Sequence, residues 1–469
     1  MYVVEFGDRR SAPFPIGPDV FKRHVWQPTL EYFLPIQMCH MRVEDSYHLW
    51  HGACHLDDAR MSPINHNHFD GYSQGPSTLT SFKPGETVPG LNAGGWHDAG
   101  DDDLRIESQA DEVFILASAY EQFHVTYDDT TVDEANHVAR IHQPDGKPDI
   151  LQQVEHGVLQ VLGQFRAVGH SIPGIIEDTL QGYTHVGDAA SKPGVRWAFT
   201  NRTTPLQYRS IAALAAASRV LKEHDPALAK ECLDTAERVW KEEHAHPPAL
   251  FRSFNTTGGE LIDEEIRAAV ELTIATKGTA PYRSRLEELL PQIRQRMMGN
   301  GWIAVRALPY VSADFRTQFE AAVRDYKTRT DALLAKNPFG VPIFATGWGG
   351  SGGVAAFGVR MYYLHRAFPQ IVGPEYTLRA VNYLLGAHPV NSVSWVSGVG
   401  THSKLAAYGN NRADFTFIPG GMVPGFVVVK PDFAEFKEDW PYFWYENEYV
   451  IGTVSNFILA ANAADALVK

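Results

Sequence analysis

Hydrophobic residues recur every three or four positions along most of the chain, which is the spacing of one face of an α-helix. Ile150, Val154, Val158, Val161 and Phe165 give one clear example. The same spacing recurs in residues 211–221, 231–244, 284–297, 354–368, 376–387 and 454–468. The chain is therefore predicted to be mainly helical from residue 19 onward.

Long segments rich in glycine, proline and aromatic residues separate these predicted helices. They cover residues 168–206, 386–426 and 430–448, and strand-like character is minor, as in residues 426–429. Many helices joined by long loops indicate an all-α fold, and we expect an α/α toroid that carries its function on the loops. The spacing alone does not separate a toroid from a helical bundle or a solenoid.

The N-terminus differs from the rest of the chain, because the apolar residues within 2–6 are followed by Pro13 and Pro15. We expect residues 1–18 to be an extended segment, either a terminal strand or the exit from a preceding domain. Residues 19–469 are expected to form the helical domain.

The composition of the chain argues against several classes of partner and fold. The net charge of -14 argues against a nucleic-acid or anionic-membrane partner. No apolar run reaches the about 18–20 residues that cross a bilayer, and no signal-peptide pattern is visible. Three cysteines in 469 residues do not make a disulfide scaffold. The aromatic content of 12% suits a carbohydrate-binding cleft, although a large aromatic core explains it equally well.

Four carboxylates gather in the stretch GGWHDAGDDD, residues 94–103. Asp98 and Asp101 are three positions apart with Gly100 between them, and glycine permits a tight turn. Such a loop can point both carboxylates into one cleft, where they can hold and deprotonate a water. A calcium-binding loop and a solvated acidic turn are the alternatives.

A second pair of acids lies near the C-terminus, where Glu446 and Glu448 stand among aromatic residues in YFWYENEY. Apolar surroundings raise the pKa of a carboxyl group and keep it protonated, as a general acid requires. The alternative is a glutamate that complements the dipole of the last helix. One carboxylate base and one carboxylic acid are the parts needed for glycoside hydrolysis.

These motifs resemble glycoside hydrolase family 9, the cellulase family with an (α/α)6 barrel. GGWHDAGD is similar to the family's first signature, and Asn447-Glu448 before the last predicted helix is similar to its second. Further similar segments follow in the family's order, namely residues 33–41 (FLPIQMCHM), 147–162 (KPDILQQVEHGVLQVL) and 383–403 (YLLGAHPVNSVSWVSGVGTHS). The stretch GDRRSAPFPIG is similar to the junction after an immunoglobulin-like domain in many family chains.

The resemblance implies roles for individual residues. Asp101 is expected to be the catalytic base, Asp98 its assistant on the same water, and Glu448 the general acid. The family inverts the anomeric centre, so the base and acid carboxyl groups are expected about 6.5–9.5 Å apart. Trp348 is expected to stack on a glucosyl ring, and Arg412 to bind the sugar beside the scissile bond.

Some residues depart from the family pattern. Asn410 and Asn411 stand where the family has histidines, and Asn410 is expected to bind sugar without the ability to become cationic. His97 is expected to hydrogen-bond the substrate or to orient the loop. Asp102 and Asp103 could bind a cation, tune Asp101 or face water, and we expect them to face water.

A metal site is also predicted. Cys39, Cys54 and His55, with His68 preferred over His66 as the fourth ligand, would make a closed tetrahedral zinc site. Some family members hold zinc with a similar set. Reduced core cysteines with surface histidines are the alternative, and a structural calcium ion is a further expectation.

We therefore predict an inverting, endoglucanase-like hydrolase that cleaves β-1,4-glucosidic bonds in cellulose-type β-glucans or their oligosaccharides. Alternatives are an exo-acting β-glucosidase or β-glucosaminidase, a xyloglucan or mixed-linkage glucan hydrolase, and a non-catalytic carbohydrate-binding protein. No cofactor is expected for the chemistry, and the protein is expected to be a monomer. The full-length protein is expected to be secreted or periplasmic, with a cytoplasmic location as the alternative.

Overall fold

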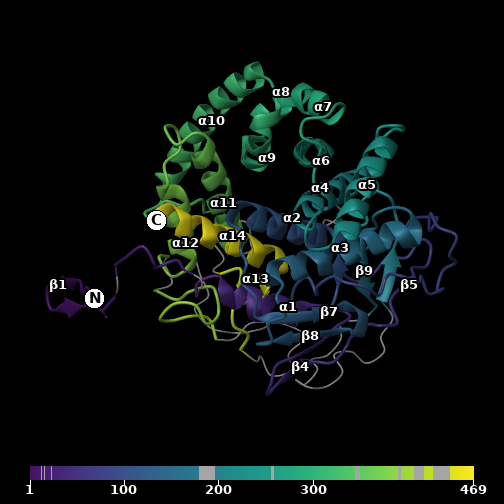
Figure 1. Ribbon diagram of the computed structural model, residues 1–469, viewed down its shortest axis with the longest axis horizontal. Helices are drawn as coiled ribbons and strands as arrows, with labels where there is room; N and C mark the ends of the chain where they lie inside the picture. The colour runs from purple at the N-terminus through teal and green to yellow at the C-terminus, as the bar shows by residue number, and fades with distance from the viewer. Residues whose placement is uncertain are drawn as a thin grey trace.

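The computed structural model describes residues 1–11, 13–14, 16–22, 24–178, 196–254, 258–343, 349–388, 392–405, 417–425 and 444–469. Its helices are arranged in two layers around a common axis (Figure 1). Within these residues, six inner helices form a closed ring in which each packs against the next and the last packs against the first. They are α2 (Ile106–Phe123), α4 (Thr204–Val220), α6 (Leu261–Ala275), α9 (Met297–Ala304), α11 (Ser351–Ala367) and α14 (Ile451–Val468).

A second layer of helices lies outside this ring. It contains α3 (Asp149–Val168), α5 (Pro226–Glu243), α7 (Tyr282–Glu288), α8 (Leu290–Gln295), α10 (Ala313–Leu334) and α12 (Glu375–Leu384). The short helices η1 (Thr29–Phe33) and α1 (Leu34–Gln37) complete the layer, with η1 against α3 and α14. The 3-10 helix η3 (Val305–Tyr310) follows α9, and the one-turn elements η2 (Glu134–Asn136) and α13 (Trp444–Asn447) lie in loops. The prediction of an (α/α)6 barrel is confirmed.

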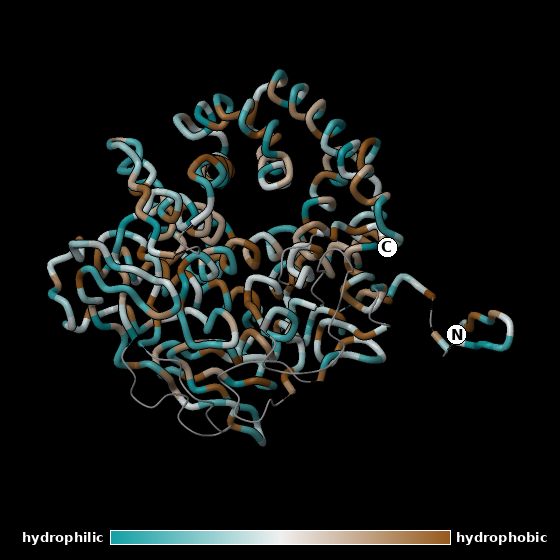
Figure 2. The backbone as a smooth tube through the Cα atoms, turned by 180° about the vertical axis from the view of Figure 1, so that it is seen from behind, coloured by the Kyte–Doolittle hydropathy of each residue, from teal (hydrophilic) through white to brown (hydrophobic). Residues whose placement is uncertain are grey.

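The sequences of the two layers explain their positions. Helix α4 is rich in alanine and almost entirely buried, because small side chains let α2 and α6 approach it closely. Helix α5 is amphipathic, and it begins where the Asp225 carboxylate accepts the backbone N–H groups of Ala227 and Leu228 at 3.0 and 2.9 Å. Its buried stripe includes Cys232, which is a core residue. Hydrophobic and hydrophilic residues accordingly alternate every few positions along the outer helices (Figure 2).

Helix α14 is long and apolar enough to cross a bilayer by length and composition alone. In the structure it is an inner barrel helix that packs against α2 on one side and α11 on the other. Residues such as Val454, Phe457 and Ile458 are fully buried in these contacts. The apolar composition of α14 is therefore that of a core helix.

Two small sheets lie beside the barrel and position loops. One has the order β5–β10–β9–β6, with β5 Arg60–Met61, β10 Arg196–Phe199, β9 Gly174–Glu177 and β6 Leu104–Arg105. The other has the order β4–β3–β8–β7, with β4 Leu49–His51, β3 Arg42–Glu44, β8 Val138–Ile141 and β7 Thr130–Asp133. Strand β6 runs directly into α2, so the first sheet fixes the loop that precedes the first inner helix.

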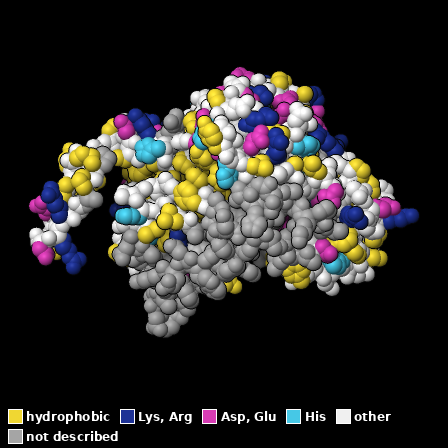
Figure 3. Space-filling model, turned by 90° about the horizontal axis from the view of Figure 1, so that it is seen from below, with side chains coloured by type: hydrophobic (Ala, Val, Ile, Leu, Met, Phe, Trp, Pro, Cys, Tyr) yellow, Lys and Arg dark blue, Asp and Glu magenta, His cyan; other side chains and the backbone are white. Residues whose placement is uncertain are grey.

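The N-terminal residues form a separate hairpin that projects from the body of the molecule (Figures 1 and 3). Strands β1 (Glu5–Phe6) and β2 (Arg9–Arg10) pair antiparallel, with Glu5 opposite Arg10. Apolar side chains such as Phe6 are largely exposed on it. The division at residue 18 stays a prediction.

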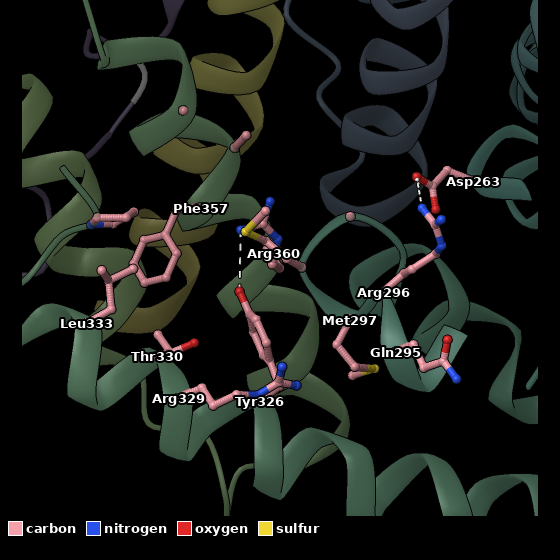
Figure 4. A pocket seen from close by; sticks show the side chains of 15 residues that line it. Asp263, Gln295, Arg296, Met297, Tyr326, Arg329, Thr330, Leu333, Phe357 and Arg360 are labelled. Atoms are coloured by element: carbon pink, nitrogen blue, oxygen red, sulfur yellow. Dashed lines mark hydrogen bonds and ion pairs between the residues drawn. The ribbon is translucent and has the colours of Figure 1, made fainter. Parts of the chain in front are cut away.

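A cavity of about 550 Å³ lies where α9, α10 and α11 meet (Figure 4). Helix α9 has only 8 residues, fewer than the other inner helices, so it fills less of the barrel wall. Met297, Leu333 and Phe357 line the cavity, and Arg360 Nη1 donates to the hydroxyl of Tyr326 at 3.4 Å. None of the predicted catalytic carboxylates lines this cavity.

Candidate active site and metal centre

The loop that carries the first signature is held by close backbone contacts. Gly94 and Gly95 have left-handed φ values of 67° and 83°, and a Cβ at Gly94 would lie 2.1 Å from the His156 carbonyl oxygen. The carbonyl oxygen of Gly95 accepts from Cys39 N at 2.8 Å and lies 2.7 Å from His156 Nε2. Gly94 and Gly95 are therefore positions where the turn requires glycine.

Trp96 anchors the same loop from the inside and does not reach a cleft. Its side chain is fully buried, and its Nε1–H donates to Gln153 Oε1 at 2.8 Å. Its ring lies against Gly157 of α3, where a Cβ would come within 2.4 Å of it. Gln109 of α2 accepts from Trp96 N and donates to Trp96 O, both at 2.8 Å. The loop is thus attached to both α2 and α3.

Three carboxylates of the loop converge on one cation, Arg105. Arg105 Nε lies 3.3 Å from Asp98 Oδ2, and its Nη2 lies 3.5 Å from Asp101 Oδ2 and 3.3 Å from Asp103 Oδ2. Asp98 is buried and Asp101 is half-buried. Among the described residues, Oδ1 of Asp98 and Oδ1 of Asp101 have no hydrogen-bond partner. These two oxygens are therefore available to accept hydrogen bonds from a water.

The expectation that Asp102 and Asp103 face water is wrong, because both side chains are buried. Asp103 Oδ1 accepts from the backbone N–H of Glu177 at 3.0 Å, and burial with the nearby Asp101 raises the pKa of Asp103 to about 7. Asp102 Oδ1 lies 3.4 Å from His97 Nδ1. Both acids belong to the interior of the site.

Glu448 approaches this loop from the other end of the chain. Its Oε1 accepts from the backbone N–H of Gly100 at 3.2 Å, one position before Asp101. Burial, followed by the charge of Asp101, raises the pKa of Glu448 to about 8. Ile451 N, at the start of α14, donates to the Asp98 carbonyl oxygen at 3.0 Å. The structure thus brings Asp98, Asp101 and Glu448 together, and Glu448 has the protonated character that a general acid needs.

Burial also acts on Asp98. It raises the pKa of the Asp98 carboxyl well above its usual value, and the neighbouring Asp101 and Asp103 act in the same direction. Arg105 opposes this shift, and the Ser108 hydroxyl lies 3.4 Å from Asp98 Oδ2. Asp98 and the more exposed Asp101 therefore occupy different electrostatic environments, although they lie on one loop.

The predicted metal ligands Cys39, Cys54 and His55 come together in a fully buried group. Cys39 Sγ lies 3.7 Å from Cys54 Sγ and 3.7 Å from His55 Nδ1. The fourth member is His97, whose Nε2 lies 3.5 Å from Cys54 Sγ. A tetrahedral zinc site with the usual bond lengths has ligand–ligand edges of about 3.4–3.8 Å, so the observed spacing fits zinc.

The fourth ligand predicted from the sequence is therefore corrected from His68 to His97. His68 Nδ1 lies 2.6 Å from Asp70 Oδ1, and its ring contacts Phe69 and Phe199. His97 is completely buried, so the expectation that it contacts the substrate is also wrong. It lies between the metal centre and Asp102.

Two functional side chains were missed in the sequence. Arg105 could have been found, because four neighbouring acids require a nearby cation. Arg196 could not, because it lies far along the chain and is brought in by strand β10. Its guanidinium donates to Cys39 Sγ at 3.2 Å, to the Asp102 carbonyl oxygen and to the Asp58 carboxylate. The predicted sugar-binding residues Trp348, Asn410 and Arg412 lie outside the described residues.

Comparison with known proteins shows which family and which solved structures the chain is similar to. The family model for glycosyl hydrolase family 9 matches residues 30–425. No curated protein sequence matches the chain. Three similar solved structures cover almost all of it. A metagenome-derived family 9 endoglucanase has a TM-score of 0.74 at 22% identity, covering 98% of this chain and 83% of that one.

The other two structures cover a similar share of the chain. A Bacteroides ovatus family 9 protein has a TM-score of 0.75 at 20% identity, covering 100% of this chain and 86% of its own. A zinc-binding triple mutant of the family 9 endoglucanase J30 has a TM-score of 0.74 at 21% identity, covering 99% of this chain and 88% of its own. At these identities the structures establish the shared fold.

Proposed function

The chain belongs to glycosyl hydrolase family 9 and is therefore a glycoside hydrolase, and we propose that it hydrolyses β-1,4-glucosidic bonds with inversion. Its substrates in this proposal are cellulose-type β-glucans or their oligosaccharides. Asp101 is the general base, Asp98 helps to hold the water, and Glu448 is the general acid. Endoglucanases among the similar structures support this choice of substrate.

One observation carries the assignment of acid and base. Glu448 is bound to the loop of Asp101 through the Gly100 N–H group, and burial raises the pKa of Glu448 to about 8. Asp101 instead lies beside the guanidinium of Arg105, which compensates its negative charge. Two carboxyl groups in one site with environments of opposite effect are the arrangement by which hydrolases separate an acid from a base.

The proposed reaction uses both carboxyl groups at once. Asp101 accepts a proton from the water while the water oxygen attacks the anomeric carbon. At the same time, Glu448 donates its proton to the glycosidic oxygen, the bond between that oxygen and the anomeric carbon breaks, and the leaving sugar departs as an alcohol. Proton exchange with solvent then returns Asp101 and Glu448 to their starting states. Attack opposite the leaving group gives inversion.

We also propose that Cys39, Cys54, His55 and His97 hold a structural zinc ion. Zinc bound by four protein ligands has no open position, so it would supply folding energy and not a step of the reaction. His97 is the residue before Asp98, so such a centre would fix one end of the catalytic loop. The zinc-binding variant of endoglucanase J30 among the similar structures supports a metal centre on this fold.

The test uses Asp101→Asn and Glu448→Gln, with the exposed Asp57→Asn as the control for a lost charge. We expect each of the first two changes to lower kcat on cellohexaose by at least about 1,000-fold, equivalent to about 4 kcal/mol. Circular dichroism should show that both variants keep the fold of the wild type. NMR of the first product that the wild-type enzyme forms should show the inverted anomer. Near-normal activity in either variant, or a retained anomer, contradicts the proposal.

The product pattern decides the substrate. Cellohexaose, carboxymethylcellulose, mixed-linkage glucan, xyloglucan and chitosan oligomers are compared with the same enzyme. We expect oligosaccharides of several lengths from the soluble β-1,4-glucan, as internal cleavage requires. Release of single sugars only would replace this proposal with an exo-acting glycosidase, and preference for chitosan oligomers would indicate a glucosaminidase.

A further inference from the structure

Behind the metal centre, five buried polar atoms have no hydrogen-bond partner among the described residues. They are His55 Nε2, His97 Nδ1, Asp102 Oδ1 and the two carboxyl oxygens of Glu177. The four side chains lie close to one another, and each is at most 4% exposed to solvent. Unpaired buried polar atoms are costly and rare, so a cluster of them indicates a role that the fold alone does not explain.

His55 and His97 each have one ring nitrogen close to a cysteine thiol. Each turns one ring nitrogen to a thiol, since His97 Nε2 lies 3.5 Å from Cys54 Sγ and His55 Nδ1 lies 3.7 Å from Cys39 Sγ. The other nitrogen of His97 faces Asp102, and the ring of His55 lies near the same carboxyl group. His97 Nδ1 lies 3.4 Å from Asp102 Oδ1. His55 has a ligand nitrogen within 4.8 Å of carboxyl oxygens of both Asp102 and Glu177.

A metal would complete this arrangement. A neutral imidazole has one N–H group, so a metal on one nitrogen places the hydrogen on the other. The Nδ1–H of His97 would then face the carboxyl group of Asp102, and His55 would carry a free Nε2–H on a ring that lies near the same carboxyl group. Carboxylates that accept the outer N–H groups of metal-bound histidines orient those rings and strengthen metal binding.

Asp102 is also fixed through its backbone. It follows Asp101 directly, and its carbonyl oxygen accepts from Arg196, which also donates to Cys39 Sγ and Asp58. Strand β9 holds the opposite side, because Glu177 N donates to Asp103 Oδ1 at 3.0 Å. Asp102 is thus held in place directly next to Asp101.

We propose that Asp102, supported by Glu177, is a positioning residue that couples the Cys39–Cys54–His55–His97 centre to the catalytic base. The proposal rests on the zinc site and on the role of Asp101 proposed above. Zinc orients Asp102 through the two histidines, and Asp102 in turn sets the position of the Asp101 carboxylate. The pair of acids that departs from the family signature thus joins the two sites.

The first measurement is zinc affinity by competition with a chelator at constant pH. It compares the wild type with Asp102→Ala, Asp102→Asn and the exposed control Asp57→Asn. We expect Asp102→Ala to weaken zinc binding by about 10–100-fold. Asp102→Asn, which still accepts a hydrogen bond, should lie between that value and the wild type, and Asp57→Asn should match the wild type. Cobalt substituted for zinc should show an altered visible spectrum in Asp102→Ala.

The second measurement is the coupling itself. The ratio of kcat with saturating zinc to kcat after zinc removal is determined for the same proteins. We expect zinc removal to lower kcat clearly in the wild type and in Asp57→Asn, and to have a much smaller effect in Asp102→Ala. Equal zinc affinities together with an equal ratio in wild type and Asp102→Ala would overturn the inference.

The outcomes separate this inference from the proposals on which it rests. An active Asp101→Asn protein overturns the proposed base, and a wild type that binds no zinc overturns the proposed metal site. Should Asp102→Ala not fold, Asp102→Asn and Glu177→Gln carry the same two measurements. Wild-type zinc affinity and an unchanged kcat ratio in both of those variants would also overturn the inference.

Discussion

The loop of Asp101 and the segment of Glu448 meet in one site, but they are built differently. The Asp101 loop is held by α2, α3 and strand β9, next to the proposed zinc site, and Arg105 compensates its charges. The Glu448 segment follows the one-turn helix α13 and enters α14, and its carboxyl group accepts from Gly100 N–H. The comparison teaches that the surroundings of each carboxyl group decide which proposed role it can take. A cation compensates the charge of Asp101, the proposed base, whereas burial raises the pKa of Glu448, the proposed acid.

Removal of the cation should have the largest effect. Arg105→Gln leaves Asp98, Asp101 and Asp103 close together without the positive charge that opposes their mutual repulsion. We expect kcat/KM on cellohexaose to fall by at least about 1,000-fold, which is about 4 kcal/mol of transition-state stabilisation. Steady-state kinetics measure this, with Arg105→Lys as the variant that keeps the charge. If Arg105→Gln were as active as the wild type, the charge of Arg105 would have no part in the function of the base.

The second test concerns the close packing of the Asp101 loop against α3 at Gly94. Gly94→Ala adds a methyl group 2.1 Å from the His156 carbonyl oxygen at a φ of 67°, so it combines strain with a backbone clash. We expect a loss of about 3 kcal/mol or more in the free energy of unfolding. Gly90→Ala is the matched control, because Gly90 has a φ of 88° but no atom within 4 Å of an added Cβ.

Denaturant unfolding of both variants gives the two free energies. Gly90→Ala should lose only the about 1–2 kcal/mol of backbone strain. The difference between the two variants then isolates the contact between the loop and α3. Equal losses would mean that this contact does not stabilise the loop.

The acid side is tested by pH. Burial raises the pKa of Glu448 from 4.5 to about 8, so the protonated acid is lost as pH rises through that value. We expect kcat/KM for cellohexaose to fall about tenfold per pH unit above this point. An aryl cellobioside with a good leaving group needs little acid assistance, so its rate should fall much less. Identical alkaline limbs for the two substrates would contradict the role of Glu448.

The same pKa shift acts on stability. Between about pH 4.5 and pH 8, the folded state keeps a proton on Glu448 that the unfolded state has lost, so this group's contribution decreases as pH rises. Its contribution is fully present below pH 4.5. Glu448→Gln should flatten this part of the unfolding free energy against pH, which denaturant titrations at several pH values can measure.

The sequence predicted the helical fold and the main chemistry because both depend on local patterns. Spacing of apolar residues reveals helices, and the GGWHDAGD and Asn447-Glu448 motifs are contiguous. The burial of Asp102 and Asp103 was not predictable, because it depends on strand β9 pairing beside β6. His97 was misread for a similar reason, since its partner Cys54 lies 43 positions away and only the fold shows which way its ring points.

The hydrogen bond from Ile451 N to the Asp98 carbonyl oxygen joins the loop that precedes the first inner helix of the barrel to the last inner helix. Contacts between residues so far apart in sequence form late and slowly. During synthesis, the ribosome must therefore release α14 before the ring can close. Until then the chain holds the base without its acid, so a nascent or C-terminally truncated protein should have no hydrolytic activity. Ring closure thus acts as the final assembly step of the enzyme.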